Sequence, residues 1–476
     1  MADVPLHHAT LTELAARIRS GETGPVEVAT RLLERVEALD GELHAFRLVT
    51  RDRALAQARA AEAALRAGVD LGPLHGLPYA VKDLFDVRGL PTTAGTRLRE
   101  HAVAAADAEV VRRLDRAGMV LLGKTHTVQF AYGGVGMNGD QGTPHNPWHP
   151  IAHAPGGSSS GSAVAVAAGM APLALGTDTG GSVRIPASLC GTVGLKTTVG
   201  RISRAGVYPL SFSLDSVGPL ARSVEDAALV YQQLQGPDPA DETTAGVAPH
   251  DALRELRAGV KGLRLAFAET TFFDEVDAEV ERAVRAAGDV LRELGASVES
   301  LEFPQARDAV LLNPRGLVIA AEAYACNREY VERHLDELDP LVRGRLQRGR
   351  DVAGPDYFEA TRRWAALRQE ADRALAHVDA LLVPATLRPA LPTAPLAADL
   401  EAYGQANLQY LRNTTIGNVL RLCGLAVPCG FTREGLPIGL MIYGRGFTED
   451  TILRVGYAYE RAAGWHARHP DLSWAE

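Results

Sequence analysis

Two segments rich in glycine and serine contain the residues best suited to chemistry. One spans 156–161 (GGSSSG) and the other spans 178–182 (DTGGS). Glycine lets the backbone adopt positive φ and approach other groups closely, so several N–H groups of such a turn can point at one place. Donors arranged in that way stabilise negative charge on a carbonyl oxygen, and Ser182, at the end of its turn, is placed to attack that carbonyl. Taken alone, each segment is more often an ordinary loop or linker.

A serine nucleophile requires a base, and Lys82 is the strongest candidate. In the apolar run YAVKDLF its amine must reach solvent, form an ion pair or lose its charge. A base that works near neutral pH needs a lysine pKa roughly three units below its usual value of about 10.4, and burial can cause such a shift. The alternative is a structural lysine paired with Asp83 or Asp86. None of the 14 histidines stands in an obvious serine–aspartate–histidine order.

Two glycine motifs in the same region suggest other chemistry, but their context is wrong. Residues 157–161 match the G-x-S-x-G nucleophile elbow of α/β-hydrolases, with Ser159 at its centre. That elbow follows an apolar strand, and here the preceding residues are HAPGG. Residues 134–139 match the G-x-G-x-x-G dinucleotide fingerprint, but the following residues do not have a helical pattern. Neither motif therefore predicts a site.

The histidines and cysteines do not predict a metal site or a disulfide framework. His145, His149 and His153 are regularly spaced, but prolines between them would break the helix needed to align them on a metal. The 4 cysteines are sparse and form no C-x-x-C pair, which fits a reducing compartment. We expect Cys190 to be a small buried apolar residue. We expect no metal and no cofactor.

The elements that must position these residues alternate between helix and strand. Residues 1–70 have the spacing of helices, 263–303 predict a strand–helix–strand unit, and 305–376 predict mostly helix. Further strands are expected at 77–87, 119–125, 173–176, 379–385, 425–431 and 437–443, and further helices at 108–118, 162–169 and 448–464. Because no linker or repeat interrupts this mixture, a single large α/β domain is the simplest interpretation.

Composition places the chain among ordinary globular proteins and argues against several partners. Of its 476 residues, 46% are hydrophobic and 22% are charged, and the net charge is −9. That charge argues against a nucleic-acid surface. The N-terminus lacks the pattern of a signal peptide, and no apolar run is long enough to span a membrane. We therefore expect a cytoplasmic protein, monomeric or homodimeric, that binds neither nucleic acid nor membrane.

Taken together, the segment 156–196 and the strand that contains Lys82 resemble the amidase signature family. The separation of Ser158 from Ser182, and that of Lys82 from Ser158, match the family's spacing. The resemblance covers most of the chain and includes Gly123-Lys124-Thr125, Asn146-Pro147-Trp148, Val427-Pro428-Cys429-Gly430 and Leu436-Pro437-Ile438-Gly439.

The resemblance implies a fold, in which a central mixed and twisted β-sheet is covered by helices on both faces. Within one domain spanning 1–476, it suggests an N-terminal helical segment at 1–70 and a catalytic core at 75–225. A helix-rich region on the substrate side would follow at 226–380, part of it over the site, and residues 381–476 would return to the core sheet.

The resemblance also implies a catalytic role for each site residue. Ser182 would attack the carbonyl carbon, and Ser158, in a cis peptide, would pass its proton to neutral Lys82. The N–H groups of an oxyanion hole would come from Thr179, Gly180, Gly181 and Ser182. The supporting residues would be Ser159, Asp178 and Arg184.

Several positions depart from the family's usual residues, and we expect them near the bound substrate. Ser160 replaces a glycine, Arg421 and Cys423 replace a glycine and a proline, and the stretch 125–129 (THTVQ) replaces one that contains Asn and an acid. None belongs to the triad. The chemistry is therefore expected to be retained, while the substrate is open.

Two activities within the family compete. A glutaminase subunit of a tRNA-dependent amidotransferase is expected to carry an acid where this chain has Leu411, so a stand-alone amidase for a small-molecule amide is favoured. The stretch 418–423 (NVLRLC) is closer to members that act on urea-like or carbamate compounds, which makes a urethanase a further candidate. A catalytically silent scaffold is the non-enzymatic alternative, and the intact triad argues against it.

Overall fold

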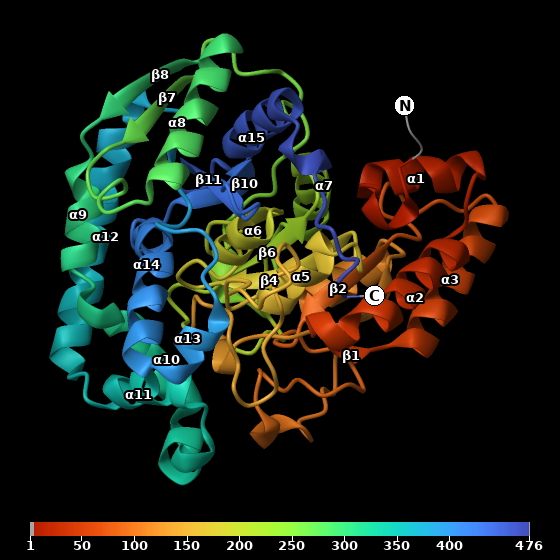
Figure 1. The fold of residues 1–476 in the computed structure, drawn as a ribbon, viewed down its shortest axis with the longest axis horizontal. Helices are drawn as coiled ribbons and strands as arrows, with labels where there is room; N and C mark the ends of the chain where they lie inside the picture. Colours follow the sequence, from red (N-terminus) through yellow and green to blue (C-terminus); the bar gives the residue numbers. More distant parts are fainter. Residues whose placement is uncertain (1–3, 476) are drawn as a thin grey trace.

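Short apolar runs form the strands of one β-sheet in the computed structural model, which describes residues 4–475 (Figure 1). Within those residues the sheet has 11 strands in the order β1-β3-β2-β4-β6-β5-β10-β11-β9-β7-β8. Pairing is parallel within β3–β2–β4 and within β9–β7–β8, and antiparallel elsewhere. The strands are β1 (Phe46–Val49), β2 (Pro78–Lys82), β3 (Val120–Thr125), β4 (Leu173–Asp178), β5 (Val193–Lys196), β6 (Ser216–Ala221), β7 (Arg264–Ala268), β8 (Ser297–Leu301), β9 (Ala380–Pro384), β10 (Cys423–Phe431) and β11 (Pro437–Gly444).

Helices cover both faces of this sheet, as predicted. Helices α7, α8 and α15 pack together on one face, and α5 and α6 pack together on the other. Helices α9 to α12 form a group beside α14 (Figure 1). The bounds are α1 (Leu11–Ser20), α2 (Pro25–Leu43), α3 (Arg51–Arg66), α4 (Glu109–Arg116), α5 (Ser160–Ala167), α6 (Arg184–Cys190), α7 (Val224–Leu234), α8 (Ala278–Glu293), α9 (Pro304–Leu311), α10 (Leu317–Arg333), α11 (Pro340–Arg350), α12 (Gly354–Ala374), α13 (Thr393–Ala398), α14 (Leu400–Val419) and α15 (Glu449–Ala463).

The elements closest to the two glycine–serine turns are short and almost entirely buried. Every residue of β2, β4, α5 and α6 is buried. Helix α5 is built of small residues, and Gly161 in its first turn leaves no room for a side chain because Ala45 O and His126 N lie against it. Small residues therefore let α5 approach the sheet closely and bring the first turn next to the second.

The structure corrects several expected boundaries. The described part of the segment expected to be helical, 4–70, contains α1, α2 and α3 and also β1, which pairs with β3. Helix α5 begins at Ser160, not at 162, and the strand expected at 77–87 ends at Lys82. Strands β5 and β6 and helices α13 and α14 lie where the sequence pattern predicted no element. Their runs are short or rich in glycine, polar residues and proline, so tertiary packing determines them more than local periodicity does.

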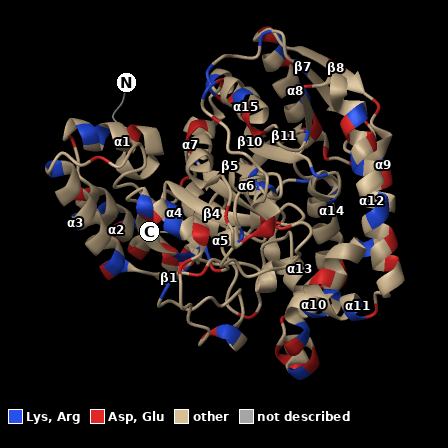
Figure 2. Cartoon of the chain, turned by 180° about the vertical axis from the view of Figure 1, so that it is seen from behind, with Lys and Arg blue, Asp and Glu red and all other residues tan. Residues whose placement is uncertain are grey.

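Charged residues of both signs are mixed over the outer helices, for example along α12 (Figure 2). None of the helices within residues 4–475 combines the length and the apolar character needed to cross a bilayer.

Candidate active site

Lys82, the base predicted from the sequence, lies at the end of β2 and contacts Ser158, the predicted relay serine. Lys82 is fully buried, and its Nζ donates to Ser158 Oγ at 2.8 Å and to Thr177 Oγ1 at 2.8 Å. The alternative pairing with Asp83 or Asp86 is wrong. Asp83 instead forms a buried ion pair with Lys124 at 2.5 Å, and the lysine amine is directed at hydroxyl groups.

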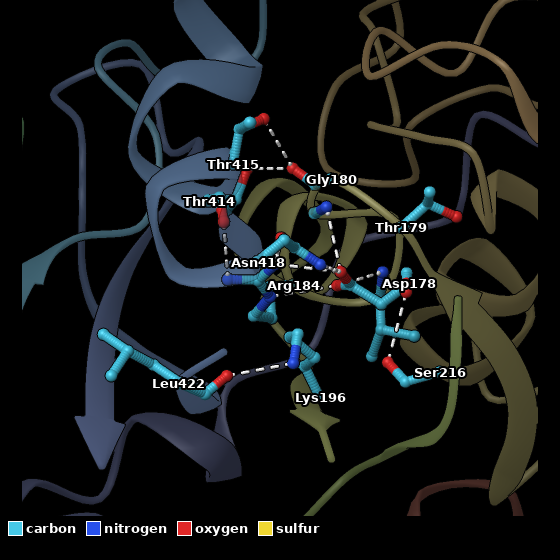
Figure 3. A network of polar contacts seen from close by, with 12 residues as sticks. Asp178, Thr179, Gly180, Arg184, Lys196, Ser216, Thr414, Thr415, Asn418 and Leu422 are labelled. Atoms are coloured by element: carbon cyan, nitrogen blue, oxygen red, sulfur yellow. Dashed lines mark hydrogen bonds and ion pairs between the residues drawn. The ribbon is translucent and has the colours of Figure 1, made fainter. Parts of the chain in front are cut away.

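The surroundings of Lys82 favour its neutral form. Burial lowers the pKa of Lys82 to about 7, although the carboxylates of Asp215 and Asp178 act in the opposite direction. A fraction of the amine can therefore accept a proton at neutral pH. Lys196, at the end of β5, is also buried, and it donates to the carbonyls of Thr197 and Leu422 rather than to a catalytic serine (Figure 3).

The first turn fixes Ser158 against the second turn. The Gly157–Ser158 peptide bond is cis, and Ser158 is fully buried. Its neighbour Ser159 donates from its N–H to Ser182 O at 3.2 Å and from Oγ to Thr177 O at 3.3 Å. Ser159 therefore acts as a link between the two turns, and its burial rules out the elbow interpretation in which it would be the exposed nucleophile.

The carboxylate of Asp178 organises the second turn (Figure 3). It accepts from the N–H of Gly181 at 3.0 Å and from the N–H of Val183 at 3.1 Å. Arg184 adds two hydrogen bonds, at 2.9 Å from Nε and 2.8 Å from Nη2. Burial opposes the charge of Asp178, but the Arg184 guanidinium beside it holds the pKa of that carboxyl well below its usual range. The pair is thus an ionised anchor for the turn.

Residues from the C-terminal part of the chain complete this anchor. Arg184 also donates to Asn418 Oδ1 at 2.5 Å and to the Tyr443 hydroxyl at 2.6 Å, and Asn418 donates back to Asp178 Oδ1 at 3.0 Å. Gly180 O accepts from the hydroxyl of Thr414 at 2.6 Å. Helix α14 and strand β11 therefore hold the catalytic turn in place.

The second turn presents backbone donors beside the nucleophile. Ser182 is 4% exposed and lines a large cavity. Within residues 4–475, the N–H groups of Thr179, Gly180 and Ser182 donate to no protein acceptor, which suits an oxyanion hole. The N–H of Gly181 differs, because Asp178 accepts it. Gly181 has φ +138° and a side chain there would collide with Thr414, so only glycine fits this position.

The cavity in front of Ser182 has a volume of about 900 Å³ and is lined largely by α9, α10, α11 and α14. Helices α9, α10 and α11, which belong to the region 305–376 that we expected to lie partly over the site, contribute lining residues. Helix α14 was missed as a lining element. Its buried Tyr403 and Tyr410 are seven residues apart, on one face of a helix, but the polar residues and glycines between them hide an apolar repeat, so this helix depends on packing more than on a visible local pattern.

The cavity wall around the nucleophile is mostly apolar, with a basic group farther along. Leu411 lies against both Gly134 and Gly180, where a side chain on Gly134 would come within 2.9 Å of its Cγ. Ile319 packs against the same Gly180. Arg345 extends over the ring of Tyr132, with 4.7 Å between its Cζ and the ring centroid.

The positions that depart from the family's usual residues do not line this cavity, contrary to expectation. Ser160 is buried in the first turn of α5, and Cys423 is buried at the start of β10. Arg421 stacks on Phe447 at 5.0 Å. The stretch 125–129 lies behind the cavity wall and contributes no lining residue. Their places along the chain, close to the family's motifs, suggested the substrate site but could not give the direction of their side chains.

The loop histidines and Cys190 are bound to backbone groups. His145 Nε2 contacts His149 O at 3.0 Å, and His153 Nδ1 contacts Ile151 O at 2.7 Å. Cys190 is fully buried, as expected, and its thiol donates to Pro155 O at 3.2 Å. Burial raises the pKa of this thiol well above its usual value, so it is a poor nucleophile.

Comparison with known proteins gives one consistent family. A family model described as Amidase matches residues 27–453. An amidase from Pseudomonas putida is 42% identical over 475 residues, covering 98% of this chain and 98% of that protein. A glutamyl-tRNA(Gln) amidotransferase subunit from Roseiflexus sp. (strain RS-1) is 39% identical over 495 residues, covering 98% and 99%. The native peptide amidase from Stenotrophomonas maltophilia superposes with a TM-score of 0.84 at 33% identity, covering 98% of this chain and 100% of that one.

Proposed function

Since this chain belongs to the amidase signature family and is a hydrolase of amide C–N bonds, we propose that it is a stand-alone amidase for small molecules with Ser182 as nucleophile. The observation that carries the proposal is the hydrogen bond from Lys82 Nζ to Ser158 Oγ, formed by a buried amine whose pKa is about 7. It supports a base that acts through a serine.

The mechanism begins with proton transfer. Ser182 Oγ attacks the carbonyl carbon while Ser158 takes its proton and passes its own to neutral Lys82. The N–H groups of Thr179, Gly180 and Ser182 stabilise the oxyanion. Lys82 returns the proton through Ser158 to the leaving nitrogen, and the C–N bond breaks. Water then attacks the acyl-enzyme, losing its proton along the same path, and Ser182 is restored.

Leu411 is the basis for preferring a stand-alone amidase over a glutaminase subunit. A glutamine substrate carries an ammonium group that must be matched by a negative charge or by strong acceptors. Leu411 offers an apolar wall beside Gly180, where a glutaminase would be expected to have an acid. The apolar wall suits a neutral acyl group.

The glutaminase subunit is the second candidate because relatives such as the Roseiflexus protein are named as part of that amidotransferase. A carbamate or urea-type bond is a variant of the first candidate, since the same nucleophile, relay and oxyanion donors would act on its carbonyl carbon. The C–N bond cleaved and the acyl group accepted are thus separate questions for experiment.

A substrate panel tests the proposal. Steady-state kcat/KM is measured on a neutral anilide, a urethane of matched size and L-glutamine. We expect the neutral anilide or the urethane to exceed glutamine, and a strong preference for glutamine would contradict the stand-alone assignment. Ser182→Ala should abolish turnover of the best substrate. Unchanged turnover in that variant would overturn the mechanism, and a wild-type protein inactive on all three would favour the scaffold alternative.

A further inference from the structure

A second cavity, which shares no lining residue with the cavity in front of Ser182, lies where the N-terminal and C-terminal segments meet. It has a volume of about 390 Å³ and lies between α1, the start of α7 and the end of α15. Figure 1 shows α1 beside α7, with both termini on that side of the molecule. Its polar lining includes Arg222, His8, His466 and His469.

Arg222 is a buried cation without a matching anion. Only 7% of the residue is exposed, and its Nη2 donates to His7 O at 2.5 Å. Within the described part of the chain its Nε has no hydrogen-bond partner. Two acids, Asp226 and Glu13, act on it electrostatically without forming a direct ion pair among the described residues. Asp226 uses its oxygens to accept from Leu11 N and Thr12 N, at 3.0 and 3.2 Å. A buried guanidinium without a direct anionic partner is costly, so its retention requires an explanation.

Histidines from both ends of the chain lie around the same cavity. The rings of His8 and His469 stack with their centroids 3.7 Å apart. Among residues 4–475, the Nδ1 atoms of His8 and His466 are buried without a hydrogen-bond partner. These nitrogens can therefore donate to a guest in the cavity without breaking an existing bond.

The acids that line the cavity already have partners. Glu13 accepts from Thr10 N at 2.8 Å, Glu460 accepts from Val224 N at 2.9 Å, and Glu225 pairs with Arg257. Burial also raises the pKa of Glu460 to about 8, which reduces its negative charge at neutral pH. The polar atoms left without a hydrogen bond are thus Arg222 Nε and the Nδ1 atoms of His8 and His466, and each imidazole donates to an anion in the tautomer that carries its proton on Nδ1.

We propose that this cavity is a binding site for a small oxyanion, with Arg222 as the principal ligand and His8 and His466 as additional donors. A bound phosphate or carboxylate would satisfy the guanidinium and would connect the N-terminal segment to the C-terminal one. The site is separate from the amidase site, so it binds its anion whether or not the amide substrate has been identified correctly.

Calorimetric titration of the full chain at pH 7 tests the proposal, with inorganic phosphate and acetate titrated separately into a chloride buffer. We expect saturable binding of one anion per chain, and the tighter of the two identifies the anion class. Arg222→Met should weaken that binding at least about tenfold, because a hydrogen bond to a charged group contributes about 1.5–3 kcal/mol. Arg461→Ala is the matched control, since Arg461 lines the same cavity but is exposed, and it should bind within about twofold of the wild type.

A second variant, on the other side of the cavity, keeps the proposal testable if Arg222→Met does not fold. His466→Leu removes one donor near the C-terminus and should weaken binding severalfold while the protein stays folded. Binding by Arg222→Met that equals the wild type would overturn the proposal. So would the absence of saturable binding to either anion, or, if Arg222→Met does not fold, binding by His466→Leu that is unchanged.

Discussion

At the scale of single residues, Lys82 determines how activity depends on pH. Its pKa is lowered by burial to about 7, and only the neutral amine can accept the proton. We therefore predict that kcat/KM on a neutral amide rises with pH through an apparent pKa near 7. Lys82→Arg should lose about 10²–10⁴-fold in rate because the guanidinium does not release its proton. A flat profile between pH 5 and 9 would contradict this role.

Asp215 is a positioning residue that the sequence motifs did not reveal. Its carboxylate accepts from the Thr179 hydroxyl at 2.5 Å and from the N–H groups of Leu210 and Ser211 at 2.9 and 3.0 Å. Thr179 supplies one of the oxyanion donors, and the charge of Asp215 raises the pKa of Lys82. One carboxylate thus affects both the oxyanion hole and the base.

Replacing Asp215 should shift the pH profile. We predict that Asp215→Asn moves the acid limb of kcat/KM to lower pH, since removing the negative charge lowers the pKa of Lys82, and that it decreases kcat by disturbing Thr179. Asp241→Asn is the control, because Asp241 is a buried carboxylate that pairs with Arg204. An acid limb that moves equally in both variants would indicate a general effect of charge.

At the scale of elements, α14 connects the substrate to the catalytic turn. Its Leu411 contacts Gly180, while Thr414 binds the Gly180 carbonyl. We compare kcat/KM for a substrate that bears an ammonium group with kcat/KM for its neutral analogue. We predict that Leu411→Asp increases the ratio of the first to the second by about tenfold or more, since an ion pair of moderate strength contributes about 1.4 kcal/mol. Leu408→Asp, at the exposed part of the same cavity, is the control. An equal change in both variants would show that only net charge matters.

Helix α10 is fastened to the catalytic core through one carboxylate. Glu322 accepts from the hydroxyls of Ser211 and Ser213, from Ser213 N at 3.1 Å and from the Tyr357 hydroxyl at 2.6 Å. We predict that Glu322→Ala decreases the free energy of unfolding by about 1–3 kcal/mol, because it leaves buried donors without an acceptor. KM should also rise, since α10 lines the cavity. Urea unfolding and steady-state kinetics measure the two effects, and a stable variant with unchanged KM would refute them.

The elements that were predictable from sequence differ in kind from those that were not. Lys82, Ser158 and Ser182 stand in short motifs that are visible over a few residues, and the resemblance of their spacing to that of a known family assigned their roles. The contact of Leu411 with Gly180 and that of Asp215 with Thr179 depend on how distant segments pack. The same reason explains why the prediction for Arg421 and Cys423 was wrong. Their places in the chain suggested contact with the substrate, but Arg421 stacks on Phe447 and Cys423 is buried at the start of β10.

At the scale of the whole molecule, we expect the contact between the N-terminal and C-terminal segments to make stability sensitive to acid. His8 stacks on His469, with Arg222 close enough to oppose a further positive charge. Burial, followed by the Arg222 charge, lowers the pKa of His469 to about 4. In the unfolded chain this imidazole titrates near 6.5, so below that pH unfolding takes up a proton. Its contribution to stability is therefore present above pH 6.5 and is lost as the pH falls from 6.5 towards 4.

We predict that His469→Gln loses less stability than the wild type between about pH 7 and pH 5. Urea unfolding at both values measures this, and subtracting the wild-type loss from the variant's loss cancels the buried acids common to both proteins, whose dependence on pH runs the other way. Asp226, for instance, has a pKa raised to about 6 by burial and becomes more stable in its site as the pH falls. His101→Gln, at an exposed position, is the control and should lose as much as the wild type. Equal losses of stability in all three proteins would mean that the stacked histidines do not govern how acid affects the contact between the N-terminal and C-terminal segments.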